Sequence, residues 1–152
     1  MYFLVGTRNC GDRPLHRVFK REVRNLQRPV TYIQQNIDAT WLPYLVTPNF
    51  PTYTSGHSTQ SGAAATVLTD MLGIVTFTDT IRADHNLVPS QAPRTFDSFD
   101  DAAAEAALSR LYAGIHYSFD NNDGLASGQC IGQTVIQNVH FKDHDDDDDA
   151  ED

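Results

Sequence analysis

The chain has little cysteine and no long apolar segment. These two features argue against a cysteine metal site and against a membrane protein. Its 152 residues include two cysteines, Cys10 and Cys130, with neither a Cys-x-x-Cys pair nor the spacing of a metal site. We therefore expect two unpaired thiols, with a single disulfide as the alternative. No run approaches the roughly 20 apolar residues of a membrane span, and residues 1–5 are too few for the apolar core of a signal peptide. The sequence thus predicts a soluble protein with no membrane span and no targeting signal, of unknown compartment.

The chain also lacks a basic stripe with interleaved aromatic side chains, so we expect no nucleic-acid partner. The formal net charge of −9 is concentrated at one end. Residues 143–152 hold eight acidic residues, and the remaining 12 nearly balance the 11 lysines and arginines. Such a block is typical of a solvated chain end. We expect residues 142–152 to form an acidic disordered tail and the nearly neutral remainder to contain one domain.

Apolar spacing and capping residues predict a mostly α-helical protein with at most one short β-hairpin. The expected helical segments are residues 20–27, a piece that starts at Pro29, 61–72, 99–112 and 125–139. The clearest is the helix over 99–112, because Ser98 can cap it and Asp101 follows three residues later. Residues 75–78 are predicted to form a strand that pairs with residues 94–96.

The spacing of apolar residues also predicts which side chains face the core. The expected core positions of two of the helices are Val67, Leu68, Leu72, Cys130, Ile131, Val135 and Ile136. Gly73 is the expected end of the first of these helices, and Gly114 the expected end of the helix over 99–112. The three prolines in residues 41–51 predict an ordered loop, and residues 120–124, which do not match a calcium-loop register, are predicted to form a turn.

One segment has residues suited to anion binding and proton transfer, and it is Thr54-Ser55-Gly56-His57. Gly56 permits close approach of the backbone to a ligand or a positive φ, and amides at a helix start favour an anion. Ser55 adds a hydroxyl donor, and the His57 imidazole can exchange a proton near neutral pH. A tight turn with a surface histidine is the alternative interpretation.

A second segment combines Arg110, in a predicted helix, with His116 and Asp120 just beyond it. The guanidinium presents a planar set of donors that suits tetrahedral oxyanions. Asp120 can accept a hydrogen bond from one ring nitrogen of His116, which leaves the other nitrogen as a nucleophile or ligand. The alternative is an ordinary pair of a histidine and a carboxylate at a helix end. Arg28-Pro29, with basic residues shortly before it, is a third segment that can complete an anion pocket.

These three segments, in this order, resemble the type 2 phosphatidic acid phosphatase and vanadium-dependent haloperoxidase superfamily. Its pattern is Lys-x6-Arg-Pro, then Pro-Ser-Gly-His, then Ser-Arg-x5-His-x3-Asp. The second and third pieces here are Thr54-Ser55-Gly56-His57 and Ser109-Arg110-x5-His116-x3-Asp120. The amino-acid sequence around Arg28 and His57 is most similar to that of the soluble bacterial haloperoxidase-like branch. The resemblance covers residues 21–132 and implies a helical bundle of the acid phosphatase and haloperoxidase type.

The chain departs from the family pattern in its first segment. Thr54 replaces the motif proline, and the position seven before Arg28 is Arg21, with Lys20 one residue off register. Arg21 keeps the charge of the expected lysine but not its geometry. The long helical region that precedes the first motif in the family is also missing from residues 1–20, so we expect either a fragment with a truncated bundle or a misassigned start of the chain. The predicted organisation is an unassigned segment 1–20, a catalytic domain 21–141 and the tail 142–152.

The resemblance also implies a role for each matched residue. The implied oxyanion-binding residues are Arg21, Arg28, Ser55, Gly56 and Arg110. In a haloperoxidase, His116 would coordinate the vanadium of a vanadate cofactor, and His57 would move protons while peroxide oxidises halide. In a phosphatase, which needs no cofactor, His116 would attack a phosphomonoester to form a phosphohistidine, and His57 would protonate the leaving group. Asp120 would orient His116 in both.

The haloperoxidase is the favoured function, and the acid phosphatase is the first alternative. The second alternative is a non-catalytic remnant of this domain, which the missing N-terminal helices and Arg21 support. A truncated bundle would expose apolar helix faces, and aggregation or homo-oligomer formation would then follow.

Overall fold

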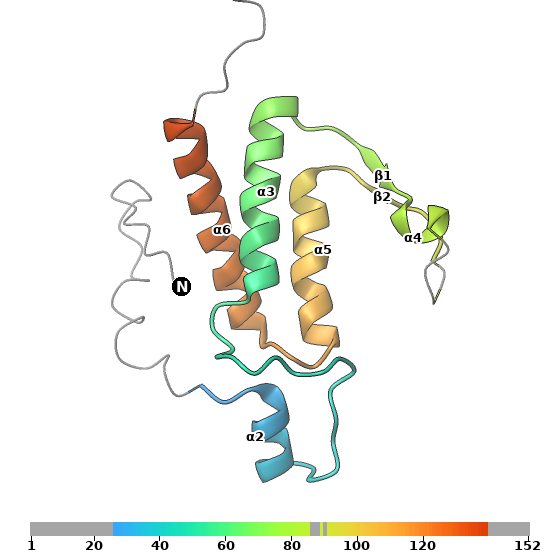
Figure 1. Ribbon diagram of the computed structural model, residues 1–152, viewed down its shortest axis with the longest axis vertical. Coiled ribbons are helices and arrows are strands. Elements are labelled where there is room, and N and C mark those ends of the chain that lie inside the picture. Colours follow the sequence, from blue (N-terminus) through green and yellow to red (C-terminus); the bar gives the residue numbers. More distant parts are fainter. Residues whose placement is uncertain (1–25, 86–88, 90, 140–152) are drawn as a thin grey trace, which may run out of the picture.

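The computed structural model describes residues 26–85, 89 and 91–139, and Figure 1 shows how they are arranged. The elements in chain order are α2 (Pro29–Asn36), α3 (Gly56–Leu72), β1 (Phe77–Asp79), α4 (Ile81–Asp84), β2 (Arg94–Phe96), α5 (Phe99–Tyr112) and α6 (Ser118–Asn138). The predictions for residues 1–20, for Arg21 and for the acidic tail lie outside the described residues. The expected helix over 20–27 does so for most of its length, and its last two residues are not helical.

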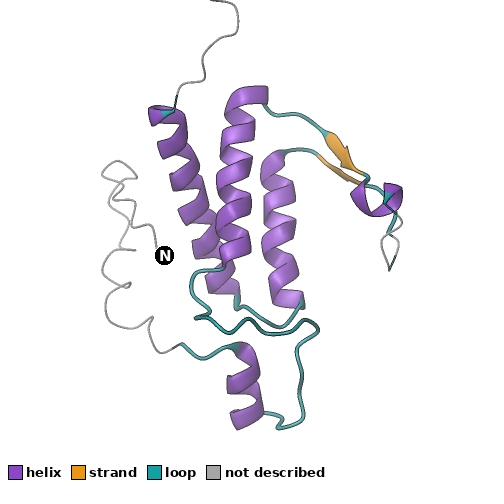
Figure 2. Cartoon of the chain, in the orientation of Figure 1, coloured by secondary structure: helices purple, strands orange, loops and turns teal. Residues whose placement is uncertain are grey.

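The three long helices α3, α5 and α6 lie side by side, and α3 packs most extensively on α6 and next on α5 (Figure 1). At one end of this bundle the loop between α2 and α3 crosses the helix ends, with α2 beyond it. At the other end β1, β2 and α4 project to one side (Figure 2). Within the described chain, β1 and β2 are the only strands. The predicted fold class, mostly α with one hairpin, is confirmed.

Glycines allow α3 and α6 to approach closely. Gly124, Gly128 and Gly132 recur every fourth residue along α6, so they share one face of the helix. A Cβ atom on Gly128 would lie 2.2 Å from the carbonyl oxygen of Thr59 in α3. A Cβ atom on Gly124 would lie 2.8 Å from the carbonyl oxygen of Ser55. The start of α6 is thereby held directly against the start of α3.

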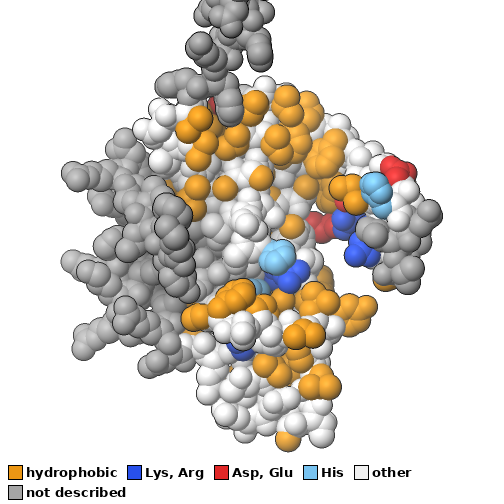
Figure 3. Space-filling view, viewed as in Figure 1, with side chains coloured by type: hydrophobic (Ala, Val, Ile, Leu, Met, Phe, Trp, Pro, Cys, Tyr) orange, Lys and Arg blue, Asp and Glu red, His pale blue; other side chains and the backbone are white. Residues whose placement is uncertain are grey.

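This glycine contact corrects the predicted core. The apolar side chains Leu68, Leu72, Ile131 and Val135, expected to face inward, are exposed. Apart from Pro29 in α2, the buried apolar residues among those described are Ala65, Ala103, Ala107, Ala113 and Ile115. Apolar periodicity pointed to the wrong faces because small residues form the helix contacts, and these leave no strong apolar pattern. Figure 3 shows hydrophobic side chains gathered over the upper part of the bundle on one face.

Two helices begin earlier than predicted. Helix α3 starts at Gly56, because Ser55 is its N-cap and its Oγ accepts a bond from the Ser58 N–H. Helix α6 starts at Ser118, so the predicted turn over 120–124 is wrong. Its first turn is stabilised by the Asp120 carboxylate, which accepts from the Tyr117 N–H at 3.2 Å.

Other local predictions are confirmed. Helix α5 has the predicted bounds, and Ser98 caps it by accepting from the Asp101 N–H at 3.1 Å. Pro29 occupies the first turn of α2. Strands β1 and β2 pair antiparallel, with Phe77 opposite Phe96. The loop over 41–51 contains no helix or strand.

Two glycines end their helices as predicted. Gly73 is the C-cap of α3 and has φ +76°, and Gly114 follows α5 with φ +74°. The predicted free thiol is wrong for Cys130, which is disulfide-bonded. No helix of the described chain combines the length and apolar character that crossing a bilayer requires.

Candidate functional site

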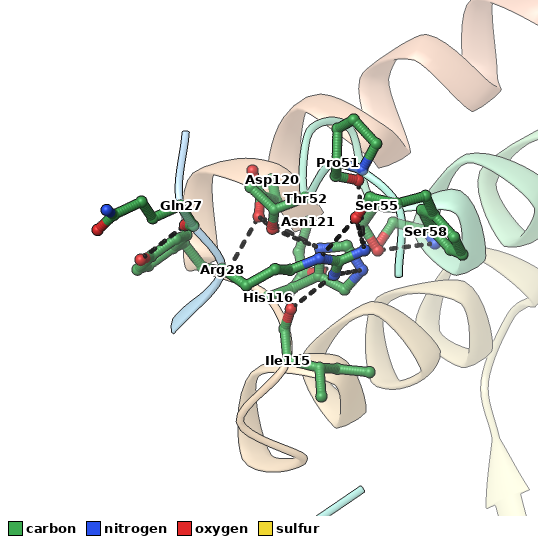
Figure 4. Close-up of polar contacts among 12 residues, drawn as sticks. Gln27, Arg28, Pro51, Thr52, Ser55, Ser58, Ile115, His116, Asp120 and Asn121 are labelled. Atoms are coloured by element: carbon green, nitrogen blue, oxygen red, sulfur yellow. Dashed lines mark hydrogen bonds and ion pairs between the residues drawn. The ribbon is translucent and has the colours of Figure 1, made fainter. Parts of the chain in front are cut away.

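Arg28, at the start of α2, joins three parts of the chain. Its Nε and Nη2 donate to the Phe50 carbonyl at 3.0 and 2.9 Å, and Nη2 also donates to the Pro51 carbonyl at 3.3 Å. Its Nη1 donates to the Ile115 carbonyl at 2.8 Å and lies 3.3 Å from His116 Nε2. Every N–H of the guanidinium therefore has an acceptor. Figure 4 shows this side chain between the loop and the turn that carries His116.

The His116 ring is fixed from both sides. Nδ1 lies 3.2 Å from Asp120 Oδ2, and Nε2 faces Arg28 Nη1. An ionised carboxylate only accepts and a guanidinium only donates, so Nδ1 carries the proton and Nε2 the lone pair. His116 and Asp120 are both buried, and the Asp120 side chain is fully so. The predicted pairing of these two residues is present in the structure, although the role of either in a reaction stays a prediction.

Thr52 belongs to this network although sequence reasoning missed it. Its hydroxyl donates to Asp120 Oδ2 at 2.5 Å and lies 3.3 Å from His116 Nδ1. It stands two residues before the Thr-Ser-Gly-His segment and is fully buried. The sequence carries no signal for this role, because it depends on the burial of Thr52 and on which carboxylate the fold places beside it.

Ser55 is oriented by two other residues that sequence reasoning missed. Its Oγ accepts from the Ser58 hydroxyl at 2.8 Å, and Ser58 Oγ lies 3.3 Å from Asn121 Oδ1 (Figure 4). All three side chains are buried. The Ser58 hydroxyl has one proton for these two acceptors, and when it is donated to Ser55 the Ser55 proton is left for another acceptor. Neighbouring Gly56 has no positive φ, and a Cβ atom built on it meets nothing within 4 Å, so there is room for a ligand beside its backbone.

Arg110 is the counterpart of Arg28 with a different environment. Its Nε is buried without a hydrogen-bond partner, and no hydrogen bond or ion pair of the described chain engages its guanidinium. Burial lowers the Arg110 pKa, as expected for a cation that loses water without gaining a partner. An unpartnered buried donor of this kind requires explanation, and an anionic ligand would provide one.

His57, in the first turn of α3, interacts electrostatically with both Arg110 and His116. Its pKa is lowered, first by burial, then by the positive charge of Arg110 and by His116. The imidazole is therefore neutral at pH 7 and able to accept a proton. Figure 3 shows histidine and basic side chains meeting in the middle of one face, bordered by hydrophobic side chains.

The structure thus brings together most of the residues predicted for the site. They come from the start of α2, the start of α3, the end of α5 and the turn before α6, and they are Arg28, Ser55, Gly56, His57, Arg110, His116 and Asp120. Arg21 lies outside the described residues. Within those residues, no cluster of three or more His, Cys, Asp or Glu is placed to hold a metal ion. The site instead offers cationic and hydroxyl donors around one imidazole, which suits an oxyanion.

Comparison with known proteins leads to the same family. The family model described as "VCPO second helical-bundle domain" matches residues 13–143. A vanadium-dependent bromoperoxidase from Ascophyllum nodosum is 35% identical over 102 residues, which are 61% of this chain and 18% of that protein. The crystal structure of a bacterial vanadium-dependent iodoperoxidase superposes with a TM-score of 0.69 at 46% identity. That match covers 76% of this chain and 28% of the iodoperoxidase chain.

The chain therefore spans less than a third of the length of either relative. The family match covers far more than half of the chain and includes every site residue named above. The chain belongs to the vanadium haloperoxidase family and matches its second helical-bundle domain.

Proposed function

We propose that this chain binds vanadate at the described site and supplies the oxyanion-binding part of a haloperoxidase that oxidises halide with hydrogen peroxide. The observation that carries the proposal is the unpartnered guanidinium of Arg110 beside His57, close to a His116 whose tautomer is fixed. The family of the chain supports vanadate over other oxyanions.

The residues present fit such an anion. Arg110 has free donors, the Ser55 hydroxyl proton is not engaged, and the space beside Gly56 is open. These groups would hold the oxygens of vanadate through charge-assisted and neutral hydrogen bonds. Arg28 adds a second positive charge next to His116. Asp120 is the carboxylate of this network, and its Oδ2 is occupied by donors from the chain itself.

His116 would hold the vanadium through Nε2, the nitrogen without the proton, which in the described chain accepts from Arg28 Nη1. When bound, vanadate supplies the activation of hydrogen peroxide toward halide. Asp120 keeps the proton on Nδ1 throughout, since its carboxylate faces that nitrogen. His57 accepts or returns a proton at the rim of the site, which its lowered pKa permits at neutral pH.

The test uses the full chain and begins with binding. Vanadate titration, followed by calorimetry and by the vanadium NMR signal, measures whether the site fills. Iodide- and bromide-dependent peroxidation and p-nitrophenyl phosphate hydrolysis are then measured with and without vanadate. We expect saturable vanadate binding and halide oxidation that requires vanadate.

Two outcomes contradict the proposal. Hydrolysis of p-nitrophenyl phosphate that vanadate inhibits would assign the acid phosphatase function instead. Folded protein that neither binds vanadate nor turns over any substrate would assign the non-catalytic remnant. Because the chain spans 18% and 28% of its two relatives, binding without turnover would support the vanadate site and assign the reaction to a longer assembly.

A further inference from the structure

A buried hydroxyl outside the family motif lies at the centre of the His116 network. Thr52 donates to Asp120 Oδ2 at 2.5 Å, while Asp120 Oδ2 also faces His116 Nδ1 and accepts from the Tyr117 N–H, both at 3.2 Å. Asp120 Oδ1 is buried and has no partner in the described chain. The orientation of the carboxylate is therefore set through Oδ2 alone.

Thr52 differs from the other donors to this oxygen. The Tyr117 N–H belongs to the backbone of the same helix start, and His116 is the ring that the carboxylate orients. Among the described residues, Thr52 is the one side chain from a distant segment that donates to Asp120, and it enters from the loop before α3. Its proton is used on Asp120, so a lone pair of its oxygen faces His116 Nδ1 at 3.3 Å.

Arg28 brings this threonine and the histidine together. It binds the carbonyls of Phe50 and Pro51, directly before Thr52, and the carbonyl of Ile115, directly before His116. The same guanidinium thus fixes both backbone segments, and it also donates toward His116 Nε2. The ring has acceptors at Nδ1 and a donor at Nε2, which selects one tautomer and one orientation.

We propose that Thr52 is a positioning residue for His116: its hydroxyl holds the Asp120 carboxylate against Nδ1 and so keeps the proton on Nδ1 and the lone pair on Nε2, the nitrogen beside Arg28. The inference deepens the proposed vanadate site and rests on it only for the effect on binding. Loss of a group that orients a metal ligand typically weakens metal affinity by about 10- to 100-fold. We expect a loss of this size when the hydroxyl is removed.

Two matched pairs of variants isolate the hydroxyl. Wild type and Thr52→Val have the same shape and differ in the hydroxyl, and so do Thr52→Ser and Thr52→Ala after loss of the methyl group. If Thr52→Val fails to fold, the Ser and Ala pair still decides. Thr66→Val is the control, because Thr66 lies on α3, away from the site, and its hydroxyl donates to the Gly62 carbonyl at 2.8 Å.

The first readout is the nitrogen NMR spectrum of His116 in protein without vanadate, which reports the tautomer. The second is vanadate affinity by calorimetry. We expect the Nδ1–H tautomer and full affinity for wild type, Thr52→Ser and Thr66→Val. Thr52→Val and Thr52→Ala should show mixed tautomers and the affinity loss stated above.

The two proposals fail in different ways. An unchanged His116 spectrum in both hydroxyl-free variants overturns the role of Thr52, whatever the wild type binds. A shifted spectrum in those variants, together with a wild type that binds no vanadate, supports the role of Thr52 and overturns the proposed function. An equal loss of affinity in Thr52→Ser and Thr52→Ala also overturns the inference, because the methyl group would then be the cause.

Discussion

The site has two arginines with the same expected role in the sequence motif but different hydrogen bonding in the structure. Arg28 has an acceptor for every N–H, among them the carbonyls of Phe50 and Ile115. Arg110 has a buried Nε without a partner. We call the first region the clamped half (Arg28, Thr52, His116 and Asp120) and the second the open half (Gly56, His57 and Arg110).

The difference separates two requirements of an anion site. The clamped half fixes the histidine that would contact the central atom, so its hydrogen bonds are made within the chain. The open half keeps donors and space available, at the cost of a desolvated cation. Substitutions in the clamped half should therefore affect both folding and binding, whereas those in the open half should affect mainly binding at neutral pH.

The largest expected effect comes from the centre of the clamped half. We expect His116→Ala to lower vanadate affinity by more than about 100-fold, because a direct ligand contributes more than the groups that orient it. Any vanadate-dependent halide oxidation should disappear with it. Calorimetry and a peroxidation assay measure both. Near-wild-type affinity in a folded variant would refute the assignment of His116 as the ligand.

The two arginines give the most direct test of the comparison. Arg28→Gln should lower the free energy of unfolding by about 3 kcal/mol, because buried carbonyls lose charge-assisted hydrogen bonds. Arg110→Gln should not lower stability, because it removes a desolvated cation that has no partner, and it should lower vanadate affinity by ~10- to 100-fold, the value of one or two charge-assisted bonds. Urea unfolding and vanadate titration of both variants measure the two quantities. Equal stability losses would abolish the distinction between the halves.

The glycine contact between α3 and α6 gives a smaller effect. Gly128→Ala should destabilise the chain by about 1–3 kcal/mol, since its Cβ would meet the Thr59 backbone and force α3 and α6 apart. Gly56→Ala is the matched control for stability, because its Cβ meets nothing within 4 Å. Thermal unfolding of the two variants measures the difference. A similar loss in both would show that glycine itself, rather than close packing, sets the cost.

The sequence indicated the local elements well where a local cause decides them. Ser98 and Asp101 predicted the start of α5, and Gly114 its end, because caps and positive φ act within a few residues. The start of α6 was missed because Asp120 and its neighbours look like turn formers. In the structure Asp120 instead caps the first turn of the helix by accepting from the Tyr117 N–H, and Gly124 packs against α3.

The site shows the same division. The motif located His57, Arg110 and His116 because residue types at fixed spacing carry that information. Thr52 and the difference between the two arginines could not be read from spacing, since they depend on which carbonyls the fold places near Arg28. Tertiary hydrogen bonds, rather than residue identity, distinguish the clamped half from the open half.

The smallest expected effect is the pH dependence that His57 gives to the open half. Its folded-state pKa is lowered by burial, then by Arg110 and His116, so the unfolded chain binds the proton more readily. The His57 contribution to stability is therefore complete above about pH 6.5 and is lost as the pH falls through the folded-state pKa. His57→Gln should remove this part of the acid destabilisation in urea unfolding between about pH 7.5 and about pH 5.

In Arg110→Gln, NMR titration should find the His57 pKa raised only in part, because burial is the larger cause and persists. Full restoration would instead identify the charge of Arg110 as the dominant influence on the open half.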